Sequence, residues 1–312
     1  MKIFNNINIP KQYKGSSLAI GNFDGVHKGH QKVFKFARLI AKKNKSKFGI
    51  LTFSPLPVMF FNKKIKNYRL TSEKEKFELL EKNGADFVIN IKFNKNFSKI
   101  SAENFVKNII YKKINPKKIF VSNNFKFGNR RKGNVNLLEK LGKKYNYRLL
   151  KINPDKYKKK MVSSTRIRNY IQKGNFYLAN KLLTRVWSVN GRVIKGRKLG
   201  RKLGYRTCNI RIKNYLLPMA GIYVVKVMIG NKKKLTKGIA YLGSRPTFKG
   251  KEIFLEINIF NFKENIYKKK LKVYFLKFIR GDRKFSSSAG LIKQMNKDVI
   301  LAKKSLKPNM FV

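Results

Sequence analysis

The sequence predicts two domains: an N-terminal α/β domain with helices flanking a parallel sheet, then a small antiparallel β-barrel with a C-terminal helix. Apolar strands alternate with amphipathic helices as far as residue 183. Short strands separated by glycine turns follow from residue 187. The 312 residues, 42% of them hydrophobic, are enough for two cores. We expect the boundary after residue 184, giving domains 1–184 and 185–312.

The first domain is predicted from strands and helices in alternation. Its strands are expected at Leu18–Ile20, Phe48–Phe53, Asp86–Ile91, Lys118–Val121 and Tyr147–Ile152. The helix after the first strand has an apolar face of Val33, Phe34, Ala37, Leu39 and Ile40. A second helix is predicted after the capping box formed by Ser72 and Glu75. A third should begin after the cap residue Ser101 and bury an inner face of Phe105, Val106, Ile109 and Ile110. A short helix is also expected at residues 175–183. Parallel strands of this kind bind ligands at their carboxyl ends.

The second domain is predicted from strands at turn spacing. They are expected at Trp187–Ile194, Tyr205–Ile212, Gly221–Ile229, Leu235–Leu242, Glu252–Phe262 and Leu271–Ile279. A final helix, Leu291–Lys303, should pack Ile292, Met295, Val299 and Ile300 against the barrel.

The formal charge of +61 admits two interpretations. A basic surface gains affinity for nucleic acid by displacing phosphate counterions. However, Lys, Asn, Ile and Phe are abundant everywhere, and the basic residues form no separate tail or arm. We therefore favour compositional drift over a dedicated nucleic-acid surface, and expect at most weak nonspecific binding.

Other compositional features limit the class of protein. The single cysteine, Cys208, excludes an internal disulfide framework and a zinc site built from cysteines. The first ten residues contain no apolar signal core, and no apolar run is long enough for a membrane span. These features predict a cytoplasmic location and no membrane partner.

The segment Gly21–His30 is the most informative part of the sequence. A strand ends at Gly21, and His27 and His30 follow at the start of a helix, with Gly29 between them. A helix N-terminus attracts phosphate, imidazoles donate hydrogen bonds to it, and glycine permits close approach. A turn with two surface histidines is the alternative. It is disfavoured because the chain has only two histidines and both occur here.

Two later segments follow predicted strands of the same domain. The first is a basic, Asn-rich loop, residues 122–133, which contains Asn124 and an aromatic pair. The second, Val162–Arg168, begins with Ser-Ser-Thr, a good helix cap. Arg166 and Arg168 lie in the first turn of that helix, where the dipole favours acids, so they indicate a bound anion.

The barrel has its own candidate site. Glycines 191, 196, 200 and 204 alternate with basic residues in a loop that lacks the ordinary P-loop pattern but suits phosphate. Thr207 and Asn209 follow it and offer hard oxygen ligands for Mg²⁺. Glu256 lies among apolar neighbours on a predicted strand. Considered alone, such an acid is more often a side chain that points to solvent than a catalytic base.

Taken together, these motifs resemble the prokaryotic bifunctional riboflavin kinase/FMN adenylyltransferase (FAD synthetase) family, along essentially the whole chain and in order. His-x-Gly-His is the signature of the nucleotidyltransferase superfamily, so the resemblance implies a Rossmann-like nucleotidyltransferase domain followed by a riboflavin kinase barrel. It implies that riboflavin is phosphorylated to FMN, and that FMN is adenylylated to FAD with release of pyrophosphate. ATP, riboflavin and FMN are then substrates, with Mg²⁺ as cofactor.

The resemblance also implies residue roles. The catalytic residues would be His27, His30, Arg168 and Glu256, with Glu256 as general base on the ribityl hydroxyl. Thr207 and Asn209 would hold Mg²⁺ with ATP. The ATP and flavin contacts would be Gly21, Phe23, Asp24, Gly29, Asn124, Ser164, Thr165, Gly191, Gly196, Gly200 and Gly204.

Several positions depart from the family pattern. Ser122 replaces a glycine and Asn123 an acid, Arg206 replaces a proline, and Tyr241 replaces an asparagine. In addition, Asn258 and Asn261 replace a His and an Asp. Two alternatives therefore stay open: a homologue with one surviving activity, the kinase being the weaker half, or a basic RNA-associated protein on the same scaffold. The sequence leaves the oligomeric state open.

Overall fold

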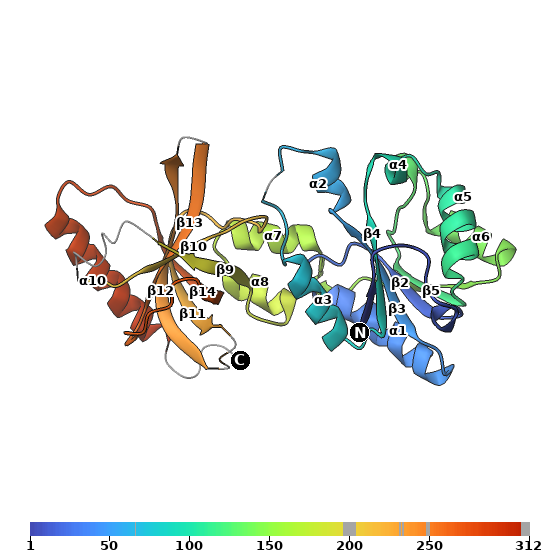
Figure 1. The fold of residues 1–312 in the computed structure, drawn as a ribbon, viewed down its shortest axis with the longest axis horizontal. Helices are drawn as coiled ribbons and strands as arrows, with labels where there is room; N and C mark the ends of the chain where they lie inside the picture. Colours follow the sequence, from blue (N-terminus) through green and yellow to red (C-terminus); the bar gives the residue numbers. More distant parts are fainter. Residues whose placement is uncertain (66, 196–203, 231, 233, 248–249, 307–312) are drawn as a thin grey trace. The chain divides into compact units, whose positions relative to one another are not determined.

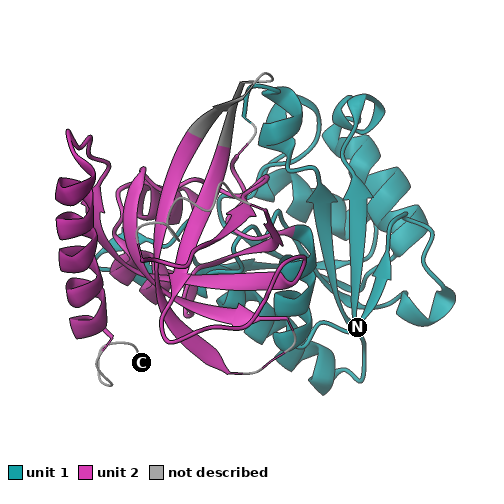
Figure 2. Ribbon diagram, turned by 60° about the vertical axis from the view of Figure 1, so that its left-hand side comes forward, with its two compact units in different colours: residues 1–66, 73–163 teal, residues 67–72, 164–312 magenta. Residues whose placement is uncertain are grey.

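The computed structural model describes residues 1–65, 67–195, 204–230, 232, 234–247 and 250–306 (Figure 1). The chain divides into two compact units, coloured separately in Figure 2. Unit 1 comprises Met1–Lys66 and Glu73–Ser163, and unit 2 comprises Asn67–Ser72 and Ser164–Val312. Among the described residues, no helix is long and apolar enough to reach across a bilayer.

Unit 1 is a six-stranded parallel sheet in the order β1-β4-β3-β2-β5-β6. The strands are β1 (Lys2–Phe4), β2 (Ser17–Ile20), β3 (Phe48–Ser54), β4 (Phe87–Lys92), β5 (Lys118–Ser122) and β6 (Arg148–Ile152). The predicted parallel α/β domain is thus confirmed, with β1 as an additional edge strand. The order reverses between β2 and β5, and such a switch point is where open parallel sheets bind ligands.

The helices of unit 1 follow the strands, as expected for parallel connections. They are α1 (Lys28–Lys43), α2 (Pro57–Phe61), α3 (Glu73–Lys82), α4 (Lys95–Ser98), α5 (Ala102–Asn104) and α6 (Val135–Lys144); a π-helical stretch, Phe105–Ile114, continues α5. The side chain of Ser101 caps α5, as predicted. A short hairpin, β7 (Lys156–Tyr157) and β8 (Lys160–Met161), precedes unit 2.

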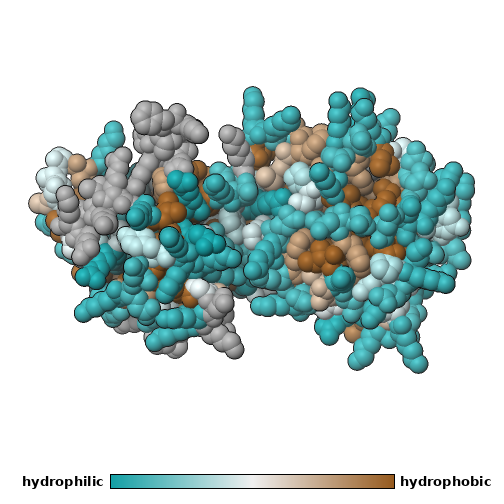
Figure 3. All heavy atoms as spheres, viewed as in Figure 1, coloured by the Kyte–Doolittle hydropathy of each residue, from teal (hydrophilic) through white to brown (hydrophobic). Residues whose placement is uncertain are grey.

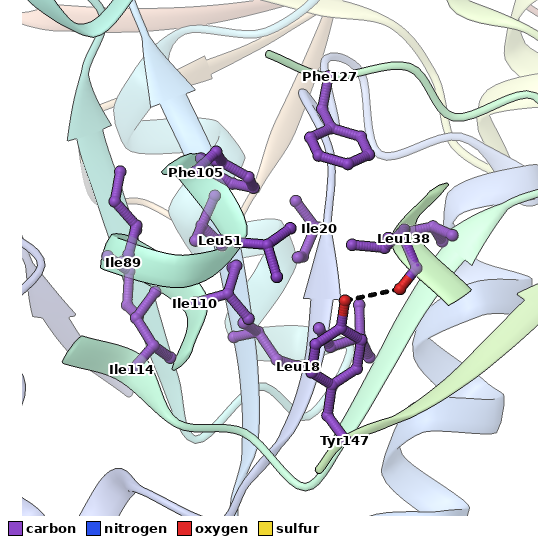
Figure 4. Close-up of a cluster of buried hydrophobic side chains, with 14 of the residues drawn as sticks. Leu18, Ile20, Leu51, Ile89, Phe105, Ile110, Ile114, Phe127, Leu138 and Tyr147 are labelled. Carbon is purple, nitrogen blue, oxygen red and sulfur yellow. Dashed lines mark hydrogen bonds between the residues drawn. The ribbon is translucent and has the colours of Figure 1, made fainter. Parts of the chain in front are cut away.

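Two cores stabilise the sheet. One contains Leu18, Ile20, Leu51 and Ile89 from the strands, packed against Phe105 and Ile110 (Figure 4). At its edge the Tyr147 hydroxyl donates a 2.6 Å hydrogen bond to the carbonyl of Leu138. The other core includes Phe34, Ile50 and Phe120. Burial of these rings and branched chains fixes the sheet from which the loops of the site project.

After the segment Asn67–Ser72, unit 2 continues with α7 (Ser164–Gln172) and α8 (Phe176–Leu183), followed by a closed barrel in the order β10-β13-β12-β11-β14-β9. The barrel strands are β9 (Ser188–Ile194), β10 (Cys208–Arg211), β11 (Gly221–Ile229), β12 (Leu235–Thr247), β13 (Gly250–Ile259) and β14 (Lys270–Gly281). Helix α10 (Ser288–Lys304) follows. The predicted antiparallel barrel and C-terminal helix are confirmed.

The compact units separate before α7, twenty-one residues upstream of the predicted domain boundary after residue 184. Helices α7 and α8 pack against each other, and α8 packs against β14. The indole of Trp187 lies beside Phe176 of α8 and Phe275 of β14 in the core of unit 2. The boundary after residue 184 remains a prediction about functional domains.

Two predicted helix faces were partly wrong. Leu39 of α1 is 55% exposed, and the buried face consists of Val33, Phe34, Ala37 and Ala41. Ile300 of α10 is 53% exposed, whereas Asp298 and Ala302 are buried. An ion pair causes the second error: Asp298 binds Arg280 of β14 and so turns its own face of the helix inward.

Candidate active sites

The first candidate site is the turn between β2 and α1. His27 is the N-cap of α1, and its Nδ1 accepts a 3.4 Å hydrogen bond from the main-chain N–H of His30. In the neutral ring this leaves the proton on Nε2. The two imidazoles stack, with ring centroids 3.6 Å apart and planes 20° apart. The histidine pair is therefore preorganised at a helix N-terminus, as the sequence predicts.

The glycines of this turn make room for its rings. A Cβ on Gly21 would lie 2.9 Å from the Phe23 ring, and a Cβ on Gly29 would lie 3.2 Å from Cε1 of His27. Phe23 has a φ of 49° and meets the His30 ring edge-on, with centroids 5.2 Å apart. Asp24 is 4% exposed in the same turn. The backbone conformation is thus built around the positions of the two imidazoles.

A buried polar chain behind the turn was not predicted from the sequence. The Thr52 hydroxyl of β3 donates to the carbonyl of Asn22 over 3.1 Å. The same hydroxyl accepts from the Lys76 ammonium of α3 over 3.2 Å, and Lys76 is 2% exposed. Sequence alone gives little indication of this because lysine usually lies at the surface.

The loop after β5 borders the other side of the switch point, because β2 pairs with β5. The Ser122 hydroxyl donates a 2.8 Å hydrogen bond to the side-chain oxygen of Asn124. The rings of Phe125 and Phe127 stack with centroids 5.6 Å apart, and Phe127 lies in the core. As expected, the aromatic pair fixes the loop, and Asn124 remains on its exposed side.

A group of phenylalanines beyond β3 and β4 was missed in the sequence. Phe93 lies at its centre: its ring centroid is 5.3 Å from that of Phe60, 5.7 Å from that of Phe61 and 5.5 Å from that of Phe97. Phe61 is 67% exposed. Their separation in sequence hides the group, although an exposed aromatic near a strand end is a usable signal.

The Ser-Ser-Thr segment belongs to unit 2 from Ser164 onward, whereas the histidines belong to unit 1. Ser164 and Thr165 lie in the first turn of α7. The expectation that Arg168 lies in that turn too was wrong, because the helix begins at Ser164 and Arg168 is its fifth residue; it is 7% exposed. The Arg168 Nε donates to the carbonyl of Tyr68 over 3.0 Å, and its guanidinium lies 3.8 Å from the centroid of the Tyr68 ring.

The barrel site lies on β10 and β13. Asn209 and Glu256 are directly opposite each other in the ladder, so their side chains share a face, and Thr207 precedes Asn209 by two residues. The Thr207 hydroxyl donates a 2.7 Å hydrogen bond to Oε1 of Glu256. Asn209 is 4% exposed, and its Oδ1 has no hydrogen-bond partner among the described residues. Glu256 thus belongs to a polar cluster and is not an isolated acid on the strand.

These oxygens fit a magnesium ion. Mg²⁺ takes hard oxygen ligands and usually binds through a few protein oxygens, waters and substrate phosphates. The Thr207 hydroxyl proton points to Glu256, which leaves the lone pairs of its oxygen for a cation. The buried Oδ1 of Asn209 is an acceptor without a partner among the described residues, and such an oxygen can serve as a ligand of a cation of this kind.

A cavity of about 310 Å³ opens next to this cluster. Its lining includes Thr207, Cys208, Ile257, Phe262 and Tyr267. Burial, with a smaller contribution from the Glu256 carboxylate, raises the pKa of the Cys208 thiol to about 12. The thiol is therefore protonated at neutral pH and behaves as an apolar part of the wall.

The predicted glycine loop is described only at its ends. Gly191 lies within β9, where a Cβ would come 2.8 Å from Ile210, so it allows close packing of two strands. Gly204 has a φ of +83°, which favours glycine. Gly196 and Gly200 lie outside the described residues.

The residues that depart from the family pattern make contacts of their own. The Asn258 amide donates to the carbonyl of Arg206 over 2.8 Å, immediately before Thr207. The Tyr241 hydroxyl donates to Asp282 over 3.0 Å. Asn261 has a φ of 54°, a conformation that asparagine tolerates well. The Asn123 amide donates to the side-chain oxygen of Asn153 over 2.5 Å.

Comparisons with known proteins identify the family of the chain. The chain matches the FAD synthetase family over residues 9–166 and the riboflavin kinase family over residues 183–306. It is 40% identical over 308 residues to a bifunctional riboflavin kinase/FMN adenylyltransferase of Buchnera aphidicola from Schizaphis graminum, covering 97% of this chain and 98% of the relative. The corresponding Escherichia coli protein is 31% identical over 290 residues, with 93% and 92% covered.

A solved structure also matches over nearly the whole chain. It is described as a macrolide-efflux protein from Streptococcus pneumoniae. The TM-score is 0.82 at 29% sequence identity, and the match covers 96% of this chain and 98% of the other.

Proposed function

Because the chain belongs to the bifunctional riboflavin kinase/FMN adenylyltransferase family, we propose that residues 185–312 phosphorylate riboflavin and residues 1–184 adenylylate FMN. The protein is thus an enzyme with two activities that makes FMN and then FAD from riboflavin and ATP. The observation that supports this assignment most strongly is the match of two family models to successive parts of one chain, covered almost completely by named relatives.

In the kinase reaction, Glu256 would accept the proton of the terminal ribityl hydroxyl. The hydroxyl oxygen then bonds to the γ-phosphorus of ATP, and the bond from that phosphorus to the ADP oxygen breaks. The 2.7 Å hydrogen bond from Thr207 orients the Glu256 carboxylate. Thr207 and Asn209 would hold Mg²⁺ with the ATP phosphates; when bound, the ion neutralises charge on the phosphate oxygens.

The cavity next to Thr207 is suited to an apolar part of a substrate. Its aliphatic and aromatic side chains and the protonated thiol of Cys208 share the wall with Arg206, Lys263, Glu264 and Asn265. Ligand pockets typically combine apolar walls with a few polar groups that orient the ligand. We assign it to the adenine base of the ATP whose phosphates meet Thr207 and Asn209.

In the adenylyl transfer, a phosphate oxygen of FMN attacks the α-phosphorus of a second ATP. The bond to the β-phosphate bridging oxygen breaks, and pyrophosphate leaves. His27, His30 and Arg168 would donate hydrogen bonds to the phosphates as charge builds on them. Loss of one preorganised donor costs ~2.7–4 kcal/mol in comparable sites. The remaining contacts of this site are proposed from Ser164, Thr165, Asn124 and the Gly21–Gly29 turn.

The phenylalanine group around Phe93 is suited to the flavin ring of FMN. Isoalloxazine is flat and aromatic, and aromatic side chains bind such rings by stacking or edge contacts. Phe61 is 67% exposed, so it presents a ring that a planar ligand can cover. The group follows β3 and β4, at the same sheet edge as the Gly21 turn.

The RNA-associated alternative is not favoured. Two family models of flavin-synthesising enzymes match successive parts of the chain, and hydrophilic residues of all kinds cover most of the visible face in Figure 3. Asn258 and Tyr241, which depart from the family pattern, both make hydrogen bonds within unit 2, which supports retention of local structure at these positions. Weak nonspecific binding of nucleic acid remains a prediction. Use of ATP in both reactions supports the proposed cytoplasmic location.

One assay tests the proposal. Purified protein is incubated with riboflavin, ATP and Mg²⁺, and the flavins are separated by chromatography. FMN should form first and FAD later, with pyrophosphate equal to the FAD formed. FMN without FAD would leave only the kinase. FAD from supplied FMN, without phosphorylation of riboflavin, would leave only the adenylyltransferase.

A further inference from the structure

The segment Asn67–Ser72 belongs to unit 2, although the residues before and after it belong to unit 1. It is attached by main-chain bonds on both sides of Arg69. The Arg69 N–H donates to the carbonyl of Asn214 over 3.1 Å, and the N–H of Leu216 donates to the carbonyl of Arg69 over 2.8 Å. The side-chain oxygen of Asn67 accepts from the Asn214 N–H over 3.1 Å. We call this segment the 67–72 strap.

The strap is also anchored in the core of unit 2. Leu70 is fully buried, and its carbonyl accepts a 2.8 Å hydrogen bond from the indole of Trp187, which is 1% exposed. Tyr68 lies between Asn67 and Leu70, which are both attached to other parts of unit 2, so its backbone is held on both sides.

Tyr68 contacts Arg168 in two independent ways. Its carbonyl accepts from Arg168 Nε over 3.0 Å, and its ring lies under the guanidinium at 3.8 Å from centroid to carbon. Together these contacts define both the plane of the guanidinium and its rotation within that plane, because Arg is planar and rigid at that end. The carbonyl and the ring are both uncharged groups, so these two contacts orient the guanidinium without neutralising it.

We propose that Tyr68 is a positioning residue for Arg168 in the adenylyl transfer. The inference rests on the proposed function of Arg168 as a phosphate-binding residue. A guanidinium binds phosphate best with two parallel N–H bonds, and this geometry requires a fixed plane. The ring of Tyr68 supplies that plane, and the 67–72 strap holds the ring. Without the ring, the Nε hydrogen bond to the Tyr68 carbonyl remains but the stacking contact that fixes the plane is lost, so the guanidinium is less well preorganised for the transition state.

The test is a set of Tyr68 variants assayed for both activities; Tyr68→Leu, which fills more of the space of the ring without a π face, should behave as Tyr68→Ala does. Tyr68→Ala should reduce kcat/KM for FMN adenylylation about thirtyfold, in line with a desolvated cation–π contact. Most of the loss should appear in kcat, since the donor acts as charge develops. Tyr68→Phe keeps ring and carbonyl and should stay within about twofold of the unchanged protein. Riboflavin kinase activity should be unchanged in both, and it reports that unit 2 is folded.

Tyr177→Ala is the matched control. Tyr177 is a tyrosine of the same unit, it is 68% exposed, and the ammonium of Lys181 lies 5.8 Å from its ring centroid. Its removal also deletes a ring next to a cation, but far along the chain from the strap. Both activities should be unaffected.

The double variant separates this inference from the proposed function. Tyr68→Ala should have no further effect on adenylylation in an Arg168→Ala background. If Arg168→Ala itself leaves adenylylation intact, the proposed role of Arg168 is wrong. If Arg168→Ala abolishes adenylylation but Tyr68→Ala and Tyr68→Leu do not weaken it, the positioning role is wrong. Equal losses of both activities in Tyr68→Ala and Tyr68→Leu would assign the ring a structural role and also overturn the proposal.

Discussion

The hydroxyl of Thr207 donates a 2.7 Å hydrogen bond to Glu256, a residue 49 positions further along the chain. Antiparallel pairing of β10 with β13 creates this contact and puts Asn209 directly opposite Glu256. An acid, a hydroxyl and a buried amide oxygen therefore occupy one face of the barrel. These groups together are suited to deprotonating an alcohol next to a magnesium-bound phosphate.

Glu256→Gln should abolish the kinase and spare the adenylyltransferase. The amide keeps the shape and can still accept a hydrogen bond from Thr207, but it cannot take a proton. Riboflavin phosphorylation should fall by roughly 10²–10⁴-fold, the usual contribution of a general base. FAD formation from supplied FMN is measured in the same preparation. Kinase activity within threefold of the unchanged protein would remove Glu256 from the role of base.

His30→Ala should have the opposite effect. Loss of one imidazole from the stacked pair removes a preorganised donor, so adenylylation of FMN should fall by roughly 10²–10³-fold, while FMN formation continues. Lys35→Ala is the control, because Lys35 is an exposed basic residue of the same helix. A similar loss in both variants would indicate that basic charge near α1 matters, and not the imidazole.

Cys208 should report on the kinase cavity. Its thiol has a pKa of about 12, so the thiolate needed for alkylation is scarce at pH 8. The rate of reaction with iodoacetamide should therefore rise about tenfold per pH unit for as long as the protein stays folded. The single thiol makes the readout unambiguous. Because Cys208 lines the cavity, Mg-ADP should slow the reaction further. Rapid alkylation at pH 7, or no protection by Mg-ADP, would contradict this placement.

The same thiol makes a contribution to stability that depends on pH. The pKa of the folded form is raised above that of the unfolded chain, so the folded form retains the proton to higher pH. This contribution is fully present below the pKa of an unfolded thiol, near 8.5. It should decrease as pH rises from there towards about 12. Cys208→Ala, tested by urea unfolding, should flatten this part of the pH profile; an unchanged profile would contradict the prediction.

Asp298→Asn should destabilise unit 2. Asp298 is buried and accepts hydrogen bonds from Nε and Nη2 of Arg280, with an N–O distance of 2.7 Å for the latter. Removing one charge leaves the other buried and unpaired, which costs ~3–5 kcal/mol of unfolding free energy. Glu139→Gln breaks an exposed pair with Lys151 and should cost under ~1 kcal/mol. Equal effects of the two substitutions in urea unfolding would contradict this account.

The sequence predicts local elements well because their signals are local. Strand and helix periodicity locates β2, α1, β3 and the barrel strands, and the Ser101 cap is found from one residue and its neighbours. Leu39 and Ile300 show where this fails. Each is apolar and follows the helical periodicity of the apolar face approximately, but the elements that pack against a helix decide which face is buried.

The site is predicted where chemistry is concentrated in a short segment, as in Gly21–His30. It is missed where distant segments meet. The rings of Phe61 and Phe93 come together because the sheet brings the ends of β3 and β4 side by side. Lys76 contacts the turn at Asn22 through the hydroxyl of Thr52. Tyr68 and Arg168, which are in contact, are 100 residues apart in the sequence. None of these pairs has a spacing that a single sequence can reveal.

The central claim is that one chain contains two separable catalytic centres. The most direct measurement mixes the His30→Ala and Glu256→Gln proteins and follows flavins by chromatography with riboflavin, ATP and Mg²⁺. The account predicts FMN alone from the first protein, no product from the second, and FAD from the mixture. Failure of the mixture to make FAD, while the Glu256→Gln protein converts supplied FMN, would contradict it.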